Sequence, residues 1–323
     1  MGRRYAFGVD LGGTNVRVVL GDDEGRILAR LSERTEIRRG PEGISKQIVR
    51  MIRSMRVKGF RLDEAEGVGI GSAGPLDLKR GGLMKPTNIP YEFVPLVEPI
   101  SDELGLETRL LNDCSTAVMG ERFFGAGKGM DNLAYITLST GIGGGVYVDG
   151  HLLIGKDGNA TEIGHFTVDY DGRLICGCGK RGHWEAYCSG ANIPNYVDLI
   201  LMEREQSEVE LSLLSMIRRR EGKVSARGLY EAAKAGDRLA LEIVDQIGRL
   251  NAVGFACVND AYDPSLITVG GSITLNNVEL VMNPIRRYIS EHSRNRIPEI
   301  RVTPLGEDVV LYGALALIFY GIS

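Results

Sequence analysis

The chain has 323 residues, of which 43% are hydrophobic and 25% are charged, as is typical of a globular protein long enough to form two domains. Its net charge of −4 at pH 7 leaves no basic excess for binding nucleic acid. Because no apolar run reaches the ~20 residues that span a membrane, and no signal-peptide core precedes the first strand, we expect a cytoplasmic protein that binds neither nucleic acid nor a membrane.

The first part of the chain alternates apolar strands with tight turns, and helices follow. Spacing and turn residues predict these elements in chain order: strands at 5–10, 16–20 and 26–31, a helix at 44–55, a strand at 67–71, a helix at 94–104, a strand at 108–111 and a helix from Ser115. Strands that alternate with helices indicate an α/β architecture with mixed sheets.

The pattern then restarts with strands at 133–138, 145–148 and 151–154, the last two joined by the hairpin turn Asp149-Gly150. We interpret this return of the order strand, glycine turn, strand, turn, strand as an internal repeat, which indicates two domains of one design. The remaining predicted elements are a surface helix or loop at 203–223, helices at 239–257, 281–289 and 309–320, and strands at 265–269 and 301–303.

Three glycine-containing segments follow predicted strands and suggest a bound nucleotide. They are Asp10-Leu11-Gly12-Gly13-Thr14-Asn15, then Ser139-Thr140-Gly141-Ile142-Gly143-Gly144-Gly145, and Gly270-Gly271. Glycine lets the backbone approach a ligand and point its N–H groups inward, so two such turns can hold one triphosphate from both sides. The third segment could lie against an adenine or a ribose. The alternative is that all three are merely tight turns.

Asp10 ends its strand beside the first glycine turn. A carboxylate next to phosphates is repelled unless a cation bridges them, so Asp10 implies Mg²⁺, bound through water.

The chain has five cysteines, and an odd number argues against a disulfide framework. Three of them lie between residues 176 and 188, beside two histidines, and this grouping suggests a metal. His165, Cys176, Cys178 and His183 supply two thiolates and two imidazoles, a closed ligand set typical of structural Zn²⁺. Cys188 is an alternative ligand to His183. The competing interpretation is two free cysteines and unrelated histidines.

Asn112-Asp113 lies where a strand enters a helix. A hydroxyl that attacks a phosphoryl group needs a proton acceptor, and Asp113 is our candidate for this base. Asn and Asp are also favoured helix N-caps, and the two roles are not exclusive.

These motifs together resemble those of the superfamily of sugar kinases, heat-shock chaperones and actin. More narrowly, the chain resembles the ROK family of repressors and sugar kinases, and within it the glucokinase-like enzymes, from about Tyr5 to Tyr320. The resemblance implies two ribonuclease-H-like α/β domains with mixed sheets that flank an interdomain cleft. We assign residues 1–112 and 305–323 to a small domain, and residues 113–304 to a large domain with the zinc loop. His183 stands where the family usually has a third cysteine.

The resemblance also implies an activity: ATP-dependent phosphorylation of a hexose at its 6-hydroxyl, with glucose the first candidate. Asp113 would take the proton and Asn112 would bind a neighbouring hydroxyl. The implied sugar-binding residues are Gly74, Asn88, Asn112, Asp113, Glu162, His165 and Glu185. The implied nucleotide-binding residues are Asp10, Gly12, Gly13, Thr14, Asn15, Thr140, Gly141, Gly143, Gly270 and Gly271. The family pattern Pro-Asn-Leu-Pro appears here as Thr87-Asn88-Ile89-Pro90. A homodimer or higher homo-oligomer is common in the family.

Three other functions stay open. The first is a kinase of N-acetylglucosamine or N-acetylmannosamine, because ROK members differ mainly around the sugar 2-position. The second is a sugar-sensing repressor, for which we expect the nine residues before Asp10 to be too few for a DNA-binding domain. The third is an actin-like or chaperone-like ATPase, which would need neither a zinc loop nor paired glutamates.

Overall fold

The computed structural model describes residues 3–86 and 89–322. Asn88 therefore lies outside the described residues. The chain divides into two compact units: Met1–Tyr135 with Gly145–Thr161 and Thr303–Ser323, and Ile136–Gly144 with Glu162–Val302. This division places residues 113–135 in the first unit, and the domain boundary at 112/113 stays a prediction.

The first sheet has the strand order β3-β2-β1-β4-β8. Its strands are β1 (Tyr5–Leu11), β2 (Asn15–Asp22), β3 (Ile27–Arg34), β4 (Ala65–Ser72) and β8 (Glu107–Asn112). The first three strands pair antiparallel, whereas β4 and β8 run parallel to β1. A mixed sheet is thus confirmed. A small sheet follows β4 and contains β5 (Leu76–Asp77), β6 (Gly82–Met84) and β7 (Phe93–Pro95).

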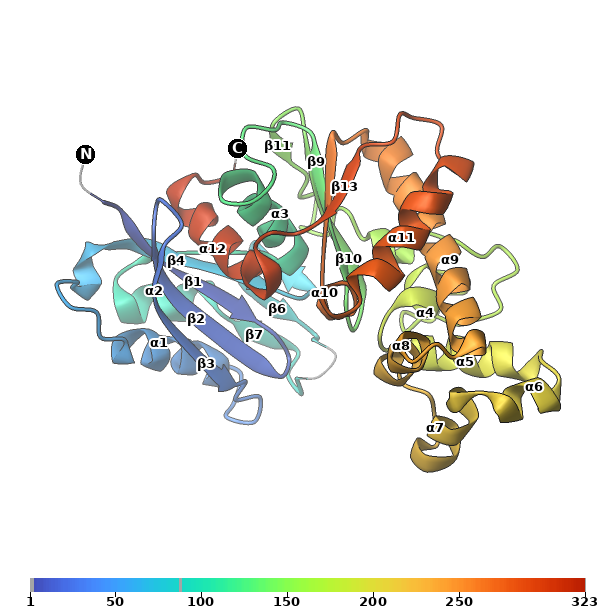
Figure 1. Ribbon diagram of the computed structural model, residues 1–323. Helices are drawn as coiled ribbons and strands as arrows, with labels where there is room; N and C mark the ends of the chain where they lie inside the picture. The colour runs from blue at the N-terminus through green and yellow to red at the C-terminus, as the bar shows by residue number, and fades with distance from the viewer. Residues whose placement is uncertain (1–2, 87–88, 323) are drawn as a thin grey trace. The chain divides into compact units, whose positions relative to one another are not determined.

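Helices cover both faces of this sheet (Figure 1). They are α1 (Gly43–Ser54) and α2 (Val97–Leu104) on one face, and α3 (Asp113–Phe123) and α12 (Val309–Phe319) on the other. Alternate residues of a strand point to opposite faces, so Phe7 and Val9 join the core with α1, whereas Ala6 packs with α12. A Cβ on Gly8 would lie 2.8 Å from the carbonyl oxygen of Leu311, so glycine lets α12 lie close to β1. By the same alternation, Asp10 faces α12.

The second sheet has the order β11-β10-β9-β12-β13. Its strands are β9 (Leu133–Leu138), β10 (Ile142–Val148), β11 (His151–Leu152), β12 (Leu266–Gly270) and β13 (Glu299–Val302). Strands β10 and β11 pair antiparallel, and β12 and β13 pair parallel. In chain order both sheets therefore read third, second, first, fourth, fifth, which confirms the predicted repeat. Strand β11 is shorter than the predicted 151–154.

The second unit is rich in helices around the long α9 (Arg238–Tyr262), which packs against α8 (Ala226–Lys234) and α11 (Val278–Tyr288) (Figure 1). The other helices are α4 (Glu185–Cys188), α5 (Ile193–Met202), α6 (Gln206–Leu211), α7 (Leu213–Glu221) and α10 (Ser272–Asn276). Short 3₁₀ helices are η1 (Leu62–Glu64), η2 (Ile163–His165), η3 (Ile289–Glu291) and η4 (Gly306–Asp308). Among the residues described, no helix combines the length and apolar character needed to cross a bilayer.

Candidate active site

The first glycine turn joins β1 to β2 and is held by one backbone bond of its own and by Thr35, just beyond β3. The amide of Gly12 donates to the carbonyl of Asn15 at 2.9 Å, and the amide of Thr35 donates to the carbonyl of Thr14 at 2.9 Å. Gly13 and Thr14 are exposed. Since the Gly12 amide is used inside the turn, Gly12 shapes the turn, and the amides of Gly13 and Thr14 are the ones placed to receive an anion.

Asp10 has a partner that the sequence reasoning missed. In the β1–β2 register, Asp10 lies directly opposite Arg17. The Nε and Nη2 atoms of Arg17 donate to Oδ2 of Asp10 at 2.9 and 2.5 Å. Burial raises the pKa of Asp10, and the Arg17 guanidinium opposes that rise. The signal was present in the sequence, because a turn that pairs Leu11 with Val16 also pairs the residues on either side of them.

Arg17 also contacts the segment that leads into α12. Its Nη2 donates to the carbonyl oxygen of Glu307 at 2.7 Å, and its Nη1 lies 3.3 Å from Oδ1 of Asp308. Arg30 pairs with the other oxygen of Asp308. The carboxylate of Asp10 is therefore held in a charged network that joins the first hairpin to the C-terminal helix.

At the N-terminus of α3, Asn112 is the helix cap. Its Oδ1 accepts from the amides of Cys114 and Ser115, at 2.9 and 3.4 Å. Oδ1 of Asp113 accepts from the amide of Cys114 at 2.8 Å, so this carboxylate is fixed at the first turn. The capping interpretation thus holds for Asn112 and leaves its amide NH₂ as the group that can donate to a ligand.

Gly74 lies just beyond β4 and is exposed. A Cβ there would meet no neighbour closer than the amide nitrogen of Leu76 at 3.6 Å, so a larger residue would fit the protein itself. An open backbone at this position is compatible with the predicted contact to a sugar.

The second glycine turn, between β9 and β10, is tied to the segment around α4. The amide of Gly190 donates to the carbonyl of Ser139 at 2.7 Å, and the amide of Ala191 donates to that of Thr140 at 3.1 Å. The amide of Ile142 donates to Oε2 of Glu185 at 2.9 Å. Thr140 itself is exposed. Besides its own bond between the amide of Ser139 and the carbonyl of Gly141 at 3.0 Å, this turn is thus held by the segment that contains α4.

A cavity of about 610 Å³ opens beside this turn. Thr140 and Ala191 line one wall, and Ser272 and Ile273 of α10 line another. The sequence reasoning missed the wall at α8 and its N-cap, which contributes Ser225, Arg227, Tyr230, Glu231 and Lys234. No motif marks those residues in the sequence. A separate cavity of about 830 Å³ lies between α1 and α2, is lined largely by charged side chains, and includes none of the predicted site residues that the structure describes.

Gly270 ends β12 and Gly271 starts the turn into α10. Gly271 has a φ of +86°, and a Cβ there would lie 2.4 Å from the carbonyl oxygen of Leu138. Packing against β9 therefore accounts for glycine at this position, and it also brings α10 to the wall of the cavity.

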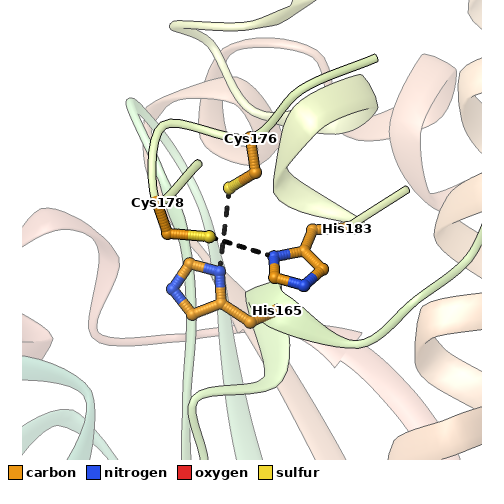
Figure 2. A group of neighbouring side chains, drawn as sticks. All are labelled: His165, Cys176, Cys178 and His183. Carbon is orange, nitrogen blue, oxygen red and sulfur yellow. Dashed lines mark hydrogen bonds between the residues drawn. The ribbon is translucent and has the colours of Figure 1, made fainter. Parts of the chain in front are cut away.

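The four predicted metal ligands lie together, as Figure 2 shows. One ligand atom from each of His165, Cys176, Cys178 and His183 falls within 4.8 Å of the others. The sulfur of Cys176 is 3.7 Å from Nδ1 of His165, and that of Cys178 is 3.3 Å from Nδ1 of His183. Ligands at the usual Zn–S and Zn–N distances of one tetrahedral ion lie roughly 3.3–3.8 Å apart, so these spacings fit zinc. Cys188 is elsewhere: its buried thiol points to the carbonyl of Ile247 at 3.6 Å.

The loop that carries the four ligands is braced by the protein itself. The hydroxyl of Tyr187 donates to Asp169 at 2.5 Å and accepts from the amide of Leu174 at 2.9 Å. The buried ring of Trp184 donates to Asn251 at 2.8 Å. The loop is therefore preorganised on α4 and α9.

The charges of the cluster suit metal binding. Burial lowers the pKa of His183, aided by neighbouring His165, so its imidazole is neutral at pH 7 and can bind a cation. Burial raises the pKa of Cys176 to about 11, so its thiol keeps its proton until a cation displaces it.

The two predicted sugar-binding glutamates flank the cluster. Oε2 of Glu162 lies 3.7 Å from Nε2 of His165, and burial raises the pKa of Glu162. His165 thus turns Nδ1 to the cluster and Nε2 to a carboxylate. Oε1 of Glu185 lies 3.8 Å from the sulfur of Cys176, while its other oxygen holds the glycine turn. That second contact of Glu185 was not predicted.

Comparisons with known proteins agree with this arrangement. The family model described as the ROK family matches residues 6–319. A glucokinase of Pyrobaculum calidifontis is 38% identical over 313 residues, which cover 97% of this chain and 94% of that protein. A ROK hexokinase of Thermus thermophilus aligns with a TM-score of 0.79 at 30% identity and 97% coverage of both chains. A ROK glucokinase of Streptomyces griseus, solved with glucose and AMPPNP, aligns with a TM-score of 0.76 at 33% identity, covering 97% of this chain and 98% of that one. The predicted fold class, with two ribonuclease-H-like domains and mixed sheets, is confirmed by these likenesses.

Proposed function

Since the chain belongs to the ROK family, we propose that it transfers the γ-phosphoryl group of ATP to the 6-hydroxyl of a hexose, with glucose the first candidate. Support comes from the relatives named glucokinase and from the solved relative that holds glucose with an ATP analogue. The observation that carries the proposal is the contact between Glu185, a candidate sugar ligand, and the amide of Ile142 in the second glycine turn. It puts candidate groups for a sugar and for a phosphate side by side within one unit.

The first unit supplies the proton acceptor and half of the phosphate site. Asp113 accepts the proton of the 6-hydroxyl as that oxygen attacks phosphorus, and the amide NH₂ of Asn112 donates to a neighbouring hydroxyl. The amides of Gly13 and Thr14 receive phosphate oxygens. Mg²⁺, when bound near Asp10, neutralises charge on the β- and γ-phosphates. Arg17 favours the ionised form of Asp10 that this task needs, because it opposes the rise in the pKa of Asp10 that burial causes.

The second unit supplies the other half. The 610 Å³ cavity receives the nucleoside, and the turn from Thr140 to Gly143 receives phosphate oxygens from its side. Glu162, His165 and Glu185 bind sugar hydroxyls, each of which both donates and accepts. The proposed reaction also requires that water be kept from the attacking position, where it would take the phosphoryl group in place of the sugar.

We also propose that His165, Cys176, Cys178 and His183 hold one structural Zn²⁺. Support comes from the donor set, from the spacing of the ligand atoms and from the neutral imidazole of His183. Bound zinc fixes the loop and takes no part in the chemistry. Its consequence for the sugar site is indirect: it fixes the ring of His165, so that Nε2 faces Glu162 and a ligand.

The test is ADP release in a coupled assay over glucose, mannose, N-acetylglucosamine and N-acetylmannosamine. We expect glucose to give the highest kcat/KM. A preference for an N-acetylhexosamine would move the assignment to the alternative kinase. ADP release that does not depend on sugar would support a chaperone-like ATPase. The absence of ADP release with any sugar would favour a sugar-sensing repressor.

A further inference from the structure

We propose that Glu185 is a positioning residue that joins the metal loop to the second glycine turn, so that metal binding sets the affinity of this turn for nucleotide. The inference rests on the proposed function, because it takes the turn to be a phosphate site. It goes further in giving Glu185 and the metal a task on the nucleotide side, whereas the family resemblance assigns Glu185 to the sugar.

The first step is the hydrogen bond between the carboxylate of Glu185 and the turn. Its Oε2 accepts from the amide of Ile142 at 2.9 Å, and a Cβ on Gly141 would lie 2.8 Å from the same oxygen. Ile142 is only 6% exposed, so water cannot readily replace the carboxylate as partner of this amide. A buried amide without a partner is costly, so the turn must rearrange when Glu185 leaves.

The second step is the link from Glu185 to the metal ligands. Its other oxygen lies 3.8 Å from the sulfur of Cys176. Glu185 also follows His183 in sequence, with only the buried Trp184 between them. A ligand precedes Glu185 along the chain and another touches its side chain, so a shift of the metal loop moves this carboxylate.

The third step is that the same segment makes two further backbone bonds to the turn, which is also contacted by Ser272 through the hydroxyl of Ser139. The amides of Gly190 and Ala191 hold the carbonyls of Ser139 and Thr140. One stretch of chain, from His183 to Ala191, thus carries a metal ligand and the groups that make these hydrogen bonds to the turn. The metal therefore has a short physical route to the turn, through one side chain and one backbone segment.

Glu162 provides a matched contrast. It is also a carboxylate beside the cluster, 3.7 Å from Nε2 of His165. Within the described parts of the chain, no hydrogen bond joins its side chain to the glycine turn. If both glutamates acted only on the sugar, replacing either one would leave nucleotide affinity unchanged. Our proposal instead predicts that only the loss of Glu185 lowers nucleotide affinity.

The experiment measures AMPPNP binding by titration calorimetry without sugar, on the full chain, zinc-loaded and after chelation. We expect chelation to weaken AMPPNP binding by about tenfold, within the usual range of coupling between sites. Glu185→Ala should bind with the same weakened affinity, and chelation should weaken it no further. Glu185→Gln keeps an oxygen that can accept from the Ile142 amide, and should restore most of the affinity. Glu162→Ala should bind AMPPNP as the wild type does.

The proposal is overturned if Glu185→Ala binds AMPPNP as tightly as the wild type, if chelation weakens both proteins equally, or if the wild type does not bind AMPPNP at all. Trp184, the sole tryptophan of the chain, lies beside Glu185, and its fluorescence reports whether the segment stays docked. Should Glu185→Ala fail to fold, Glu185→Asp replaces it, because the shorter side chain draws its carboxylate away from the Ile142 amide and should cause the same loss. Intact coupling without hexose-dependent ADP release would refute the proposed function alone.

Discussion

At the scale of single residues, the partner of each carboxylate decides what it can do. Asp10 pairs with the guanidinium of Arg17, and Asp113 accepts from an amide in the first turn of α3. One oxygen of Glu185 lies near the sulfur of a cysteine, and the other accepts from a backbone amide. Asp113 is the one of these three whose carboxylate we propose as the proton acceptor, and Asp10 and Glu185 have roles in charge and position. Two substitutions test these assignments.

Asp113→Asn should lower kcat by ~10²- to 10⁴-fold, because the amide cannot accept the proton of the attacking hydroxyl. The fold should persist, since the Asn side-chain oxygen can still accept from the amide of Cys114. Steady-state kinetics and a melting curve on the same sample measure both effects. A loss in kcat of less than threefold would remove Asp113 from this role.

Arg17→Met should destabilise the protein in a pH-dependent way. Burial raises the pKa of Asp10 above its ordinary 3.8, so the folded protein binds the carboxyl proton of Asp10 more tightly than the unfolded chain does. The free energy of unfolding therefore falls as the pH rises and Asp10 becomes ionised. Arg17 offsets that penalty, so its loss should cost about 1–3 kcal/mol at pH 7 and clearly less near pH 4. Melting or denaturant curves at the two pH values measure the difference.

Arg30→Met is the control for Arg17→Met, because Arg30 pairs with Asp308 but does not contact Asp10. It should show a small loss with little dependence on pH. An equal loss at pH 4 and pH 7 for Arg17→Met would contradict the account of Asp10.

At the scale of elements, the two glycine turns occupy matching places in their sheets but have different outside partners. Each has one internal backbone bond, but the outside partner of the first turn is Thr35, whereas the second is held by the segment from Glu185 to Ala191. The loop in turn depends on α9, against which Trp184 packs. The four proposed metal ligands and the fit of Trp184 on α9 are therefore the features to perturb.

The metal loop should hold one zinc per chain, measured by elemental analysis after dialysis. Cys178→Ser should lose the metal, whereas Cys257→Ser should keep it, because Cys257 lies outside the cluster. Binding should weaken as the pH falls below about 6, where thiols and imidazoles retain their protons. A folded, active sample without zinc would exclude the structural site.

Gly254→Ala should destabilise the protein even though alanine normally stabilises the middle of a helix. A Cβ at this position would lie 2.3 Å from the indole ring of Trp184, so the ring must move. We expect a lower melting temperature and a shift in tryptophan fluorescence. Gly228→Ala in α8 is the comparison, since its added methyl would have its nearest neighbour, the side chain of Ile217, at 3.3 Å, which must move by a few tenths of an ångström, so its loss should be much smaller. A stabilised Gly254→Ala variant would show that Trp184 is not packed as described.

At the scale of the whole molecule, the sequence was informative wherever one local rule set the structure. Alternating strands and tight turns predicted most strands of both sheets and their repeat along the chain, whereas the order of the strands within each sheet was not predicted. The stretch 203–223 was ambiguous because its polar residues suit both a loop and a short surface helix; it contains α6 and α7. The predicted helix 94–104 begins later, at Val97, because Phe93–Pro95 forms the edge strand β7.

The site was less predictable because it depends on contacts between distant segments. The four candidate ligands do lie together, and they could be singled out because they carry distinctive chemistry at short spacing; their metal stays a prediction. The Asp308 contact of Arg17 and the wall of the cavity at α8 come from ordinary surface residues, which no local pattern marks. The tether of Ile142 to Glu185 joins residues that are far apart in sequence, so only the fold reveals it.

The central claim is that both units act on one nucleotide and one hexose. A crystal structure of the full chain with glucose, AMPPNP and Mg²⁺ tests it most directly. We predict that the glucose 6-hydroxyl lies within hydrogen-bonding distance of Asp113, at about 2.6–3.2 Å, and faces a γ-phosphate bound by the amides of both glycine turns. A hexose and a nucleotide bound in separate cavities, with Asp113 remote from the 6-hydroxyl, would contradict the account.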